Sequence, residues 1–277
     1  LMGCAGPRLQ DRPTLAPDAP PGARVIVATY NLNFGMAGDG PTLEAIAATS
    51  ADIVALQETS ARWQAAIEAH PALRRRYPHR LFFHSQRYPA GGMAFLSRYP
   101  LTEHQRRPSP AGFFDAHRVI VRLPSGPSSA PPAGAWSLQL LNVHLKPPVS
   151  RSGSVVVGYF STPKERRLEM AHFKRLLDAE LPTVILGDFN EQRGGGLQVA
   201  TAEGYRDVFR AAGITSGQAT WRWQVGPLKL RSQLDHILYD PRHFRVVGAR
   251  ILKLGRSDHL PVVATLARRR ATPRRSA

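Results

Sequence analysis

Short apolar runs recur along this chain, and most of them end in an acid, an amide or an imidazole. The clearest example is the run 183–187, which leads directly into Asp188, Phe189 and Asn190. Because side chains alternate between the two faces of a strand, we expect Phe189 to point into the core, away from Asp188 and Asn190. The recurrence of this pattern predicts two stacked sheets flanked by helices, with the polar strand ends gathered along one edge.

Strands are expected where Val, Ile and Leu are concentrated between turn residues, and helices where apolar residues repeat every three or four positions. The helices are expected at 41–50, 60–70 and 163–180, and a long irregular stretch at 146–163 precedes the last of them. The expected strands are 24–33, 52–58, 81–85, 91–100, 117–123, 136–145, 183–188, 234–240, 245–252 and 260–267.

The composition is that of a folded protein with an anionic partner. With 277 residues, 43% of them apolar, the chain can bury a sizeable core, and we expect one large domain at 24–267. No apolar run approaches the roughly 18–20 residues of a membrane span. The formal net charge is +17, part of which lies in a basic tail at 268–277. The remainder favours nucleic acid or an acidic headgroup surface as partner, unless it reflects an arginine-rich coding bias with solvated charges.

Cys4 is the only cysteine, so an intrachain disulfide and a cysteine zinc cluster are excluded. The start, Leu-Met-Gly-Cys, is similar to the end of a bacterial lipoprotein signal, in which the cysteine carries a lipid anchor. The following residues are rich in Pro and Ala, which suits a tether, so we interpret 1–23 as a lipobox-like start and linker. An arbitrary start of the chain is the alternative. We expect a protein of the bacterial cell envelope or a secreted one, which leaves a cytoplasmic location open.

The polar residues at the strand ends are hard oxygen ligands, amide donors or imidazoles. Taken singly, each has a simple explanation as a turn former. Taken together, carboxylates and amide oxygens suit Mg²⁺, Mn²⁺ or Ca²⁺, and imidazoles beside carboxylates suit acid–base catalysis. A hard cation, an oriented water and histidines are the groups that hydrolyse a phosphoester. The residues are Asn31, Glu58, Asn142, His144, Asp188, Asn190, Asp235, Asp258 and His259.

Two other hydrolase classes lack their signatures here. The chain has no H-E-x-x-H, which argues against a zinc protease, and no G-x-S-x-G, which argues against a serine hydrolase.

The order of the short motifs resembles the endonuclease/exonuclease/phosphatase superfamily, whose members include DNase I-like nucleases, abasic-site endonucleases, sphingomyelinases and inositol-polyphosphate phosphatases. The motifs are T-Y-N-L-N, Q-E, G-G-M-A-F-L-S, N-V-H-L, G-D-F-N, L-D-H-I-L and S-D-H-L-P-V, and they extend from about residue 25 to residue 267. The resemblance implies a DNase I-like, four-layered α/β sandwich, in which two packed mixed sheets are flanked by helices and the active site lies at one edge.

The resemblance also implies roles for the residues around a divalent metal. Glu58 would be the main metal ligand, with Asn31 beside it. Asp258 would complete the metal's surroundings, directly or through water. Asp188 would orient or deprotonate the attacking water, and Asn190 would hold the scissile phosphate.

Further roles implied by the resemblance concern the phosphate. His259 would contact a phosphoryl oxygen, with Asp235 fixing its orientation. His144 matches a second catalytic histidine of DNase I-like members. Arg118 matches an arginine that such members place near the phosphate, and we expect Asn142 to bind the phosphate as well.

The chain departs from the family pattern at two positions near Asp235. Gln233 replaces a common arginine, and His236 replaces a common tyrosine. His144 stands where abasic-site endonucleases carry a tyrosine, which argues against that repair role.

The resemblance leaves the substrate open. A metal-dependent nuclease is our first hypothesis, supported by the basic charge and by the interleaved aromatics and cations at 218–235. A lipid phosphodiesterase or phosphoinositide phosphatase, acting on an anionic headgroup at a membrane surface, is the second. A catalytically inactive binding protein is the third, and the retention of the acid, amide and histidine positions argues against it. No protein partner is inferred.

Overall fold

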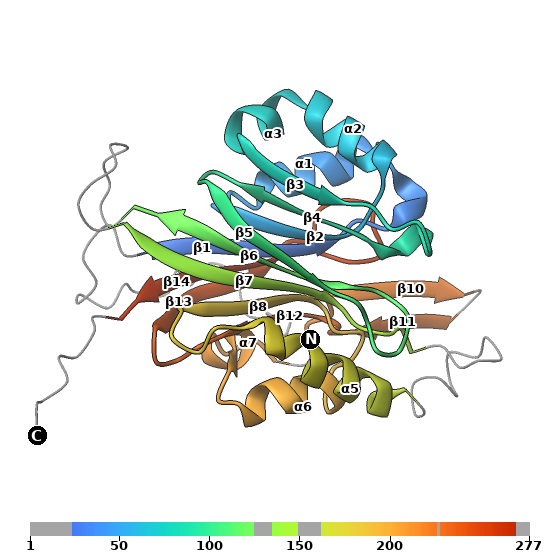
Figure 1. The fold of residues 1–277 in the computed structure, drawn as a ribbon. Helices are drawn as coiled ribbons and strands as arrows, with labels where there is room; N and C mark the ends of the chain where they lie inside the picture. Colours follow the sequence, from blue (N-terminus) through green and yellow to red (C-terminus); the bar gives the residue numbers. More distant parts are fainter. Residues whose placement is uncertain (1–23, 125–134, 149–161, 216, 226–227, 270–277) are drawn as a thin grey trace, which may run out of the picture.

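The computed structural model describes residues 24–124, 135–148, 162–215, 217–225 and 228–269 (Figure 1). Two six-stranded mixed sheets pack face to face between two layers of helices. This arrangement confirms the predicted four-layered α/β sandwich. The predicted linker at 1–23 with Cys4, and residues 270–277 of the predicted tail, lie outside the described residues.

The first sheet has the strand order β13-β14-β1-β2-β4-β3. Only β1 and β2 are parallel neighbours in it. Three helices cover its outer face, α1 (Gly40–Ala48), α2 (Ala61–Ala69) and α3 (Pro71–Arg76), and they pack through buried residues such as Ile46 and Trp63. The strands are β1 (Arg24–Asn31), β2 (Ile53–Thr59), β3 (His79–Phe83), β4 (Gly92–Ser97), β13 (Phe244–Ile251) and β14 (Val262–Arg268).

The second sheet has the order β5-β6-β7-β8-β12-β9, with β7 and β8 as its one parallel pair. Helices α5 (Pro163–Phe173) and α6 (Gly195–Ala202) cover its outer face, and Phe189 is fully buried there, as expected. The short helix α7 (Val208–Ala211) follows β9. The strands are β5 (Leu101–Arg107), β6 (Ala116–Leu123), β7 (Trp136–His144), β8 (Thr183–Asp188), β9 (Arg206–Asp207) and β12 (Asp235–Tyr239).

The remaining elements lie outside the two sheets. The hairpin of β10 (Trp221–Val225) and β11 (Leu228–Ser232) forms a separate two-stranded ribbon. The described residues also form the 3-10 turns η1 (Phe34–Met36), η2 (Pro89–Gly91) and η3 (Lys174–Leu176). Within the described residues, no helix combines the length and the apolar character that a membrane-spanning segment requires.

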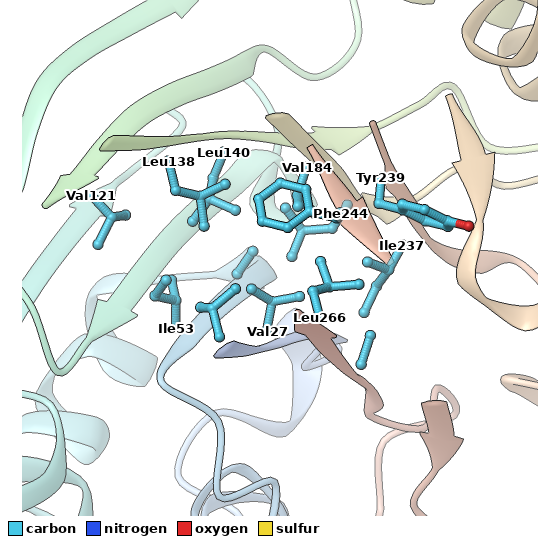
Figure 2. Packing of buried hydrophobic residues seen from close by; sticks show 14 of the residues in the cluster. Val27, Ile53, Val121, Leu138, Leu140, Val184, Ile237, Tyr239, Phe244 and Leu266 are labelled. Atoms are coloured by element: carbon cyan, nitrogen blue, oxygen red, sulfur yellow. The ribbon is translucent and has the colours of Figure 1, made fainter. Parts of the chain in front are cut away.

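The core between the sheets is formed by alternate residues of the strands. Figure 2 shows Val27, Ile53 and Leu266 of the first sheet facing Leu140 and Val184 of the second. All five are fully buried, and each stabilises the fold by about 1.5–3 kcal/mol relative to an exposed side chain. This packing fixes the distance between the two sheets, and therefore between the polar residues that end their strands.

The parallel pair in the middle of each sheet explains why polar residues gather at one edge. Parallel strands end at the same edge, where α/β proteins commonly bind ligands. In register, Asn31 of β1 lies beside Gln57 of β2, and His144 of β7 lies beside Asp188 of β8. Gly187 permits the second contact, because a Cβ there would lie 1.9 Å from the carbonyl oxygen of Val143.

We expect His117 to make the fold sensitive to acid. Its ring stacks on Phe83 with centroids 4.1 Å apart, and burial lowers its pKa from 6.5 to about 3. The folded state therefore favours neutral His117. The contribution of His117 to the stability of the fold is complete above pH 6.5 and is lost as the pH falls towards 3. Between pH 7 and pH 5, the free energy of unfolding of the wild type should fall by about 2 kcal/mol more than that of His117→Gln. Urea unfolding at the two pH values measures both changes. Equal losses in the two proteins would contradict this assignment.

Candidate active site

Asp188 lies at the centre of the polar edge, between the two sheets. Asn31 crosses from the first sheet, and its Nδ2 donates hydrogen bonds to Asp188 Oδ2 and to Glu58 Oε1, both at 3.0 Å. The Nε2 atoms of His144 and His259 lie 3.5 Å and 3.6 Å from the same Asp188 oxygen. Asp188 and four other predicted residues, from distant parts of the sequence, thus meet at one place.

A bulge in β2 directs Glu58 towards this edge. The pairing of β2 with β4 shifts register between Gln57 and Thr59, and Glu58 between them has a φ of 57°. Regular alternation would place Glu58 on the opposite face from Gln57, and a bulge redirects a side chain in this way. Glu58 Oε2 accepts a hydrogen bond from the Phe34 backbone N–H at 3.1 Å. The bulge therefore brings a carboxylate to the site from a strand whose pattern points it elsewhere.

His259 is held by a buried carboxylate partner. Its Nδ1 lies 2.8 Å from Asp235 Oδ2, which leaves Nε2 facing Asp188. Burial alone would lower the pKa of His259, but the carboxylates of Asp235 and Asp188 outweigh it and raise that pKa to about 10. Burial raises the pKa of Asp188 to about 7, against the opposing charge of His259. The carboxylates of Asp235 and Asp188 therefore favour the cationic form of His259, and burial favours uptake of a proton by Asp188.

His144 has the opposite charge state. Burial and the charge of His259 lower the pKa of His144 to about 3. Phe114 stacks on its ring with centroids 4.0 Å apart at 19°. The site therefore combines a neutral imidazole and an imidazolium on two sides of Asp188, and this difference arises from the carboxylate that only His259 has beside its Nδ1.

Asn190 follows β8 in a left-handed backbone conformation, with a φ of 52°. Its backbone N–H donates to Asp188 Oδ1 at 2.8 Å, and its Nδ2 donates to the Leu145 carbonyl at 2.9 Å. The turn thereby places the Asn190 backbone N–H against Asp188 and holds the side-chain amide on the Leu145 carbonyl.

Asp258 lies at the rim of the site, and protein donors occupy both of its carboxylate oxygens. Asn33 Nδ2 donates to Oδ1 at 2.9 Å, and Trp221 Nε1 donates to Oδ2 at 3.0 Å. The predicted part of Asp258 in the metal's surroundings stays a prediction. Asn33, Trp221 and Phe114 were not among the predicted site residues, although Asn33 lies in the T-Y-N-L-N motif and Trp221 in the segment 218–235.

Two predicted phosphate-binding residues lie elsewhere. Arg118 is on the outer face of its sheet, where its Nε donates to Gln139 Oε1 at 3.0 Å beneath the helix layer, so its predicted place near the phosphate is wrong. Asn142 is fully buried between the sheets, and its amide accepts from Gln57 at 2.7 Å and donates to the Leu56 carbonyl at 3.0 Å. Its hydrogen-bonding atoms thus hold the sheets together.

The two residues near Asp235 that differ from the family pattern, Gln233 and His236, lie outside the site. His236 is on the outer face of β12, where its Nδ1 lies 2.6 Å from Asp207 Oδ2 and its ring contacts Phe189. Gln233 donates to the Gln218 carbonyl at 3.2 Å. Both residues support the surrounding loops.

A divalent cation fits the Glu58 side of the site. The Glu58 side chain is 17% exposed, burial raises its pKa, and within the described part of the chain no lysine or arginine pairs with it. Asp188, Asp235 and His259 also place ligand atoms within 4.8 Å of one another. However, Asp235 is fully buried and hydrogen-bonded to His259, which does not suit a hard cation that keeps several waters. Glu58, with Asn31, is the better site for a hard cation.

Comparisons with known proteins identify the family and the fold. A model of the endonuclease/exonuclease/phosphatase family matches residues 28–259. A comparison with curated proteins gives no match.

Among solved structures, an endonuclease/exonuclease/phosphatase from Beutenbergia cavernae is similar, with a TM-score of 0.62 and 19% identity over 89% of this chain and 72% of that one. The human Nocturnin catalytic domain with bound sulfate has a TM-score of 0.61 and 17% identity over 89% of this chain and 94% of that one. TDP2 from D. rerio, complexed with a single strand DNA product, has a TM-score of 0.62 and 16% identity over 88% of this chain and 99% of that one. These likenesses confirm the fold, and the match over residues 28–259 shows that the chain belongs to the endonuclease/exonuclease/phosphatase family.

Proposed function

We propose that the chain is a divalent-metal-dependent phosphodiesterase that hydrolyses nucleic acid by attack of water on phosphorus. One observation carries the proposal: Asp188 Oδ2 lies within 3.6 Å of Asn31 Nδ2, His144 Nε2 and His259 Nε2. A carboxylate surrounded by donors and an imidazolium is suited to take a proton from a water while the neighbouring donors hold the phosphate.

In the proposed reaction, Asp188 accepts a proton from the water whose oxygen forms the new bond to phosphorus. The bond from phosphorus to the leaving oxygen breaks, and that oxygen departs as an alkoxide, which takes a proton from a solvent water. His259, held as a cation by Asp235, neutralises charge on a phosphoryl oxygen, and the Asn190 amide orients the phosphate. Glu58 and Asn31 would hold the metal, which when bound supplies positive charge to the phosphate and the leaving oxygen.

Family membership supports the phosphoester-hydrolase part of the proposal. The net charge of +17 favours a polyanionic substrate, and TDP2 from D. rerio, which has the same fold, was solved with a single strand DNA product.

A second candidate is a lipid phosphodiesterase at a membrane surface. Phe34, whose backbone N–H binds Glu58, is 45% exposed, and Leu254 is 47% exposed on the loop before Asp258. Exposed apolar side chains near a polar site would suit contact with a lipid surface.

The experiment that separates these candidates is a panel of substrates with Mg²⁺ or Mn²⁺. It would include single-stranded and plasmid DNA, RNA, sphingomyelin vesicles and bis-p-nitrophenyl phosphate, each with an EDTA control. We expect metal-dependent cleavage of nucleic acid and of bis-p-nitrophenyl phosphate. Cleavage of sphingomyelin in place of nucleic acid would favour the second candidate.

We expect Glu58→Gln to weaken Mg²⁺ binding by at least about tenfold, because the charge of the ligands largely sets the affinity for a hard cation. Isothermal titration with Mg²⁺ measures this without any substrate. Glu68→Gln, which changes an exposed glutamate on α2, is the matched control and should bind Mg²⁺ as the wild type does. Unchanged affinity in Glu58→Gln would remove Glu58 from the metal site.

A further inference from the structure

A cleft of about 440 Å³ lies beside the active site, between the β10–β11 hairpin and the loops that carry Asn33 and Asp258. This volume is within the range of pockets that hold small ligands. The hairpin projects beyond the two sheets (Figure 1). The cleft also has Asn33 and Asp258 in its lining, so it borders the polar edge. The residues that line the cleft include Trp223, Asp258 and four cationic residues, which are Arg222, Lys229, Arg231 and Arg256.

Most of the cationic residues of the cleft lack an ion-pair partner in the described part of the chain, although Asp258 also lines it. Arg222 and Arg231 are direct partners in the hairpin register, and like charges in that position destabilise a ribbon. Among the described residues, no carboxylate forms an ion pair with Arg222, Lys229 or Arg231. Arg256 has Asp39 at 3.6 Å, but its side chain is 68% exposed. Like charges placed side by side without carboxylate partners cost stability. Their presence at Arg222 and Arg231 points to an anionic ligand with more than one charge.

An aromatic surface lies on the face of the ribbon opposite to Arg222, Arg231 and Lys229, because side chains alternate along each strand. Trp223 is 42% exposed, and its ring lies 6.1 Å from that of Trp221. Trp221 is anchored through its Nε1 to Asp258. An exposed indole on an anchored ribbon is suited to stack on a nucleobase, and stacking requires a base whose face is free, as in a single strand.

The cleft is joined to the reacting centre through the backbone. Arg222 N–H donates to the Asp258 carbonyl at 2.8 Å, and Leu260 N–H donates to the Thr220 carbonyl at 2.7 Å. These two bonds lie on either side of His259, which itself bridges to Trp221. A ligand in the cleft would therefore be held at a fixed distance from His259.

We propose that this cleft binds the nucleotides of a single-stranded nucleic acid next to the phosphate that is cleaved. Trp223 stacks on a base at one face of the ribbon and Arg256 binds an adjacent phosphate, while Arg222, Lys229 and Arg231 on the other face bind phosphates further along the strand. The proposal rests on the proposed function for its cleaved phosphate, but the binding that it describes needs neither metal nor turnover.

The test measures the binding of a labelled single-stranded oligonucleotide in EDTA by fluorescence anisotropy. We expect Trp223→Ala to weaken binding about tenfold and Trp223→Phe to restore most of it, because stacking tolerates another aromatic ring. Arg222→Ala/Arg231→Ala should weaken binding and lower the slope of log K against log salt by about 1.4, the value for two phosphate contacts. The matched control, Arg74→Ala/Arg75→Ala, removes two exposed charges from α3 and should bind as the wild type does. Thermal melting of each variant verifies that it is folded.

Each outcome decides a separate point. Wild-type affinity in folded Trp223→Ala and Arg222→Ala/Arg231→Ala would overturn the cleft proposal, even if the wild type cleaves DNA. An equal loss for a duplex and a single strand in Trp223→Ala would overturn the single-strand assignment. Binding of anionic vesicles that depends on Trp223, without binding of the oligonucleotide, would overturn the assignment to nucleic acid. Failure of the wild type to cleave bis-p-nitrophenyl phosphate with Mg²⁺ would contradict the proposed function, whereas the affinities in EDTA would still decide the cleft.

Discussion

Replacing His259 by alanine is expected to lower kcat on bis-p-nitrophenyl phosphate by about 10³-fold while the protein stays folded. The side chain supplies a positive charge beside Asp188, at 3.6 Å, in a site largely closed to water. Removing one such charge or donor typically costs two to three orders of magnitude in rate, because the developing charge on the phosphoryl oxygens is no longer neutralised. Steady-state kinetics with saturating Mg²⁺ measures the loss.

The matched control is His84→Ala, which removes an exposed histidine that contacts Gln64. It should keep wild-type kcat. If His259→Ala retained more than about a tenth of wild-type kcat, the imidazolium would have no part in the chemical step, because the expected loss is far larger.

Replacing Arg166 by alanine is expected to lower the free energy of unfolding by about 3–5 kcal/mol, the largest stability effect that we expect. Arg166 and Glu191 are 1% and 2% exposed, and Arg166 Nε lies 2.9 Å from Glu191 Oε2. Without its partner, Glu191 would remain as a buried charge beneath the turn that carries Asn190. Urea unfolding at pH 7 measures the change.

Two further variants separate the buried pair from general effects of mutation. Arg167→Ala, one residue along α5 at an exposed position, should change stability by less than about 0.5 kcal/mol. Arg166→Met/Glu191→Leu replaces both charges with apolar side chains and should lose much less stability than Arg166→Ala. If the double variant were the less stable one, the cost would come from lost packing and not from an unpaired charge.

The sequence predicted much of the site, because its residues lie where buried strands end. His144 and Asp188 come to one edge through the parallel pairing of β7 and β8, and Asn31 reaches the same edge from β1. Hydrophobic patterning identifies such strands well, because their apolar residues face the layers on both sides. The short motifs then add the order in which those strand ends appear.

Arg118 and Glu58 show why the face on which a strand residue lies cannot be taken from a short motif alone. Arg118 was assigned to the phosphate from its place in a motif, but alternation along β6 turns it to the outer face. Conversely, Glu58 reaches the site only through a bulge that breaks alternation. A shift of one residue in a strand exchanges its two faces, so such positions need the pairing partner as well as the sequence.

Some elements carried too weak a signal to be predicted. β5 is an edge strand with mostly exposed, charged residues, so it lacks an apolar face. Helix α6 begins at Gly195 without a side-chain cap, and the predicted helix at 163–180 instead ends at Phe173 and continues as η3. Glycine is a poor helix former, and a helix end depends on tertiary packing as much as on local sequence.

The most direct test of the central claim, that Asp188 and its neighbours direct a water to phosphorus, is cleavage of an oligonucleotide in ¹⁸O-labelled water with Mg²⁺. Mass spectrometry of the products locates the label. We expect each cleavage to place one ¹⁸O atom on the newly formed terminal phosphate in the wild type, and cleavage to be abolished in Asp188→Asn. Cleavage that leaves the phosphate unlabelled, or that persists at the wild-type rate in Asp188→Asn, would contradict the claim.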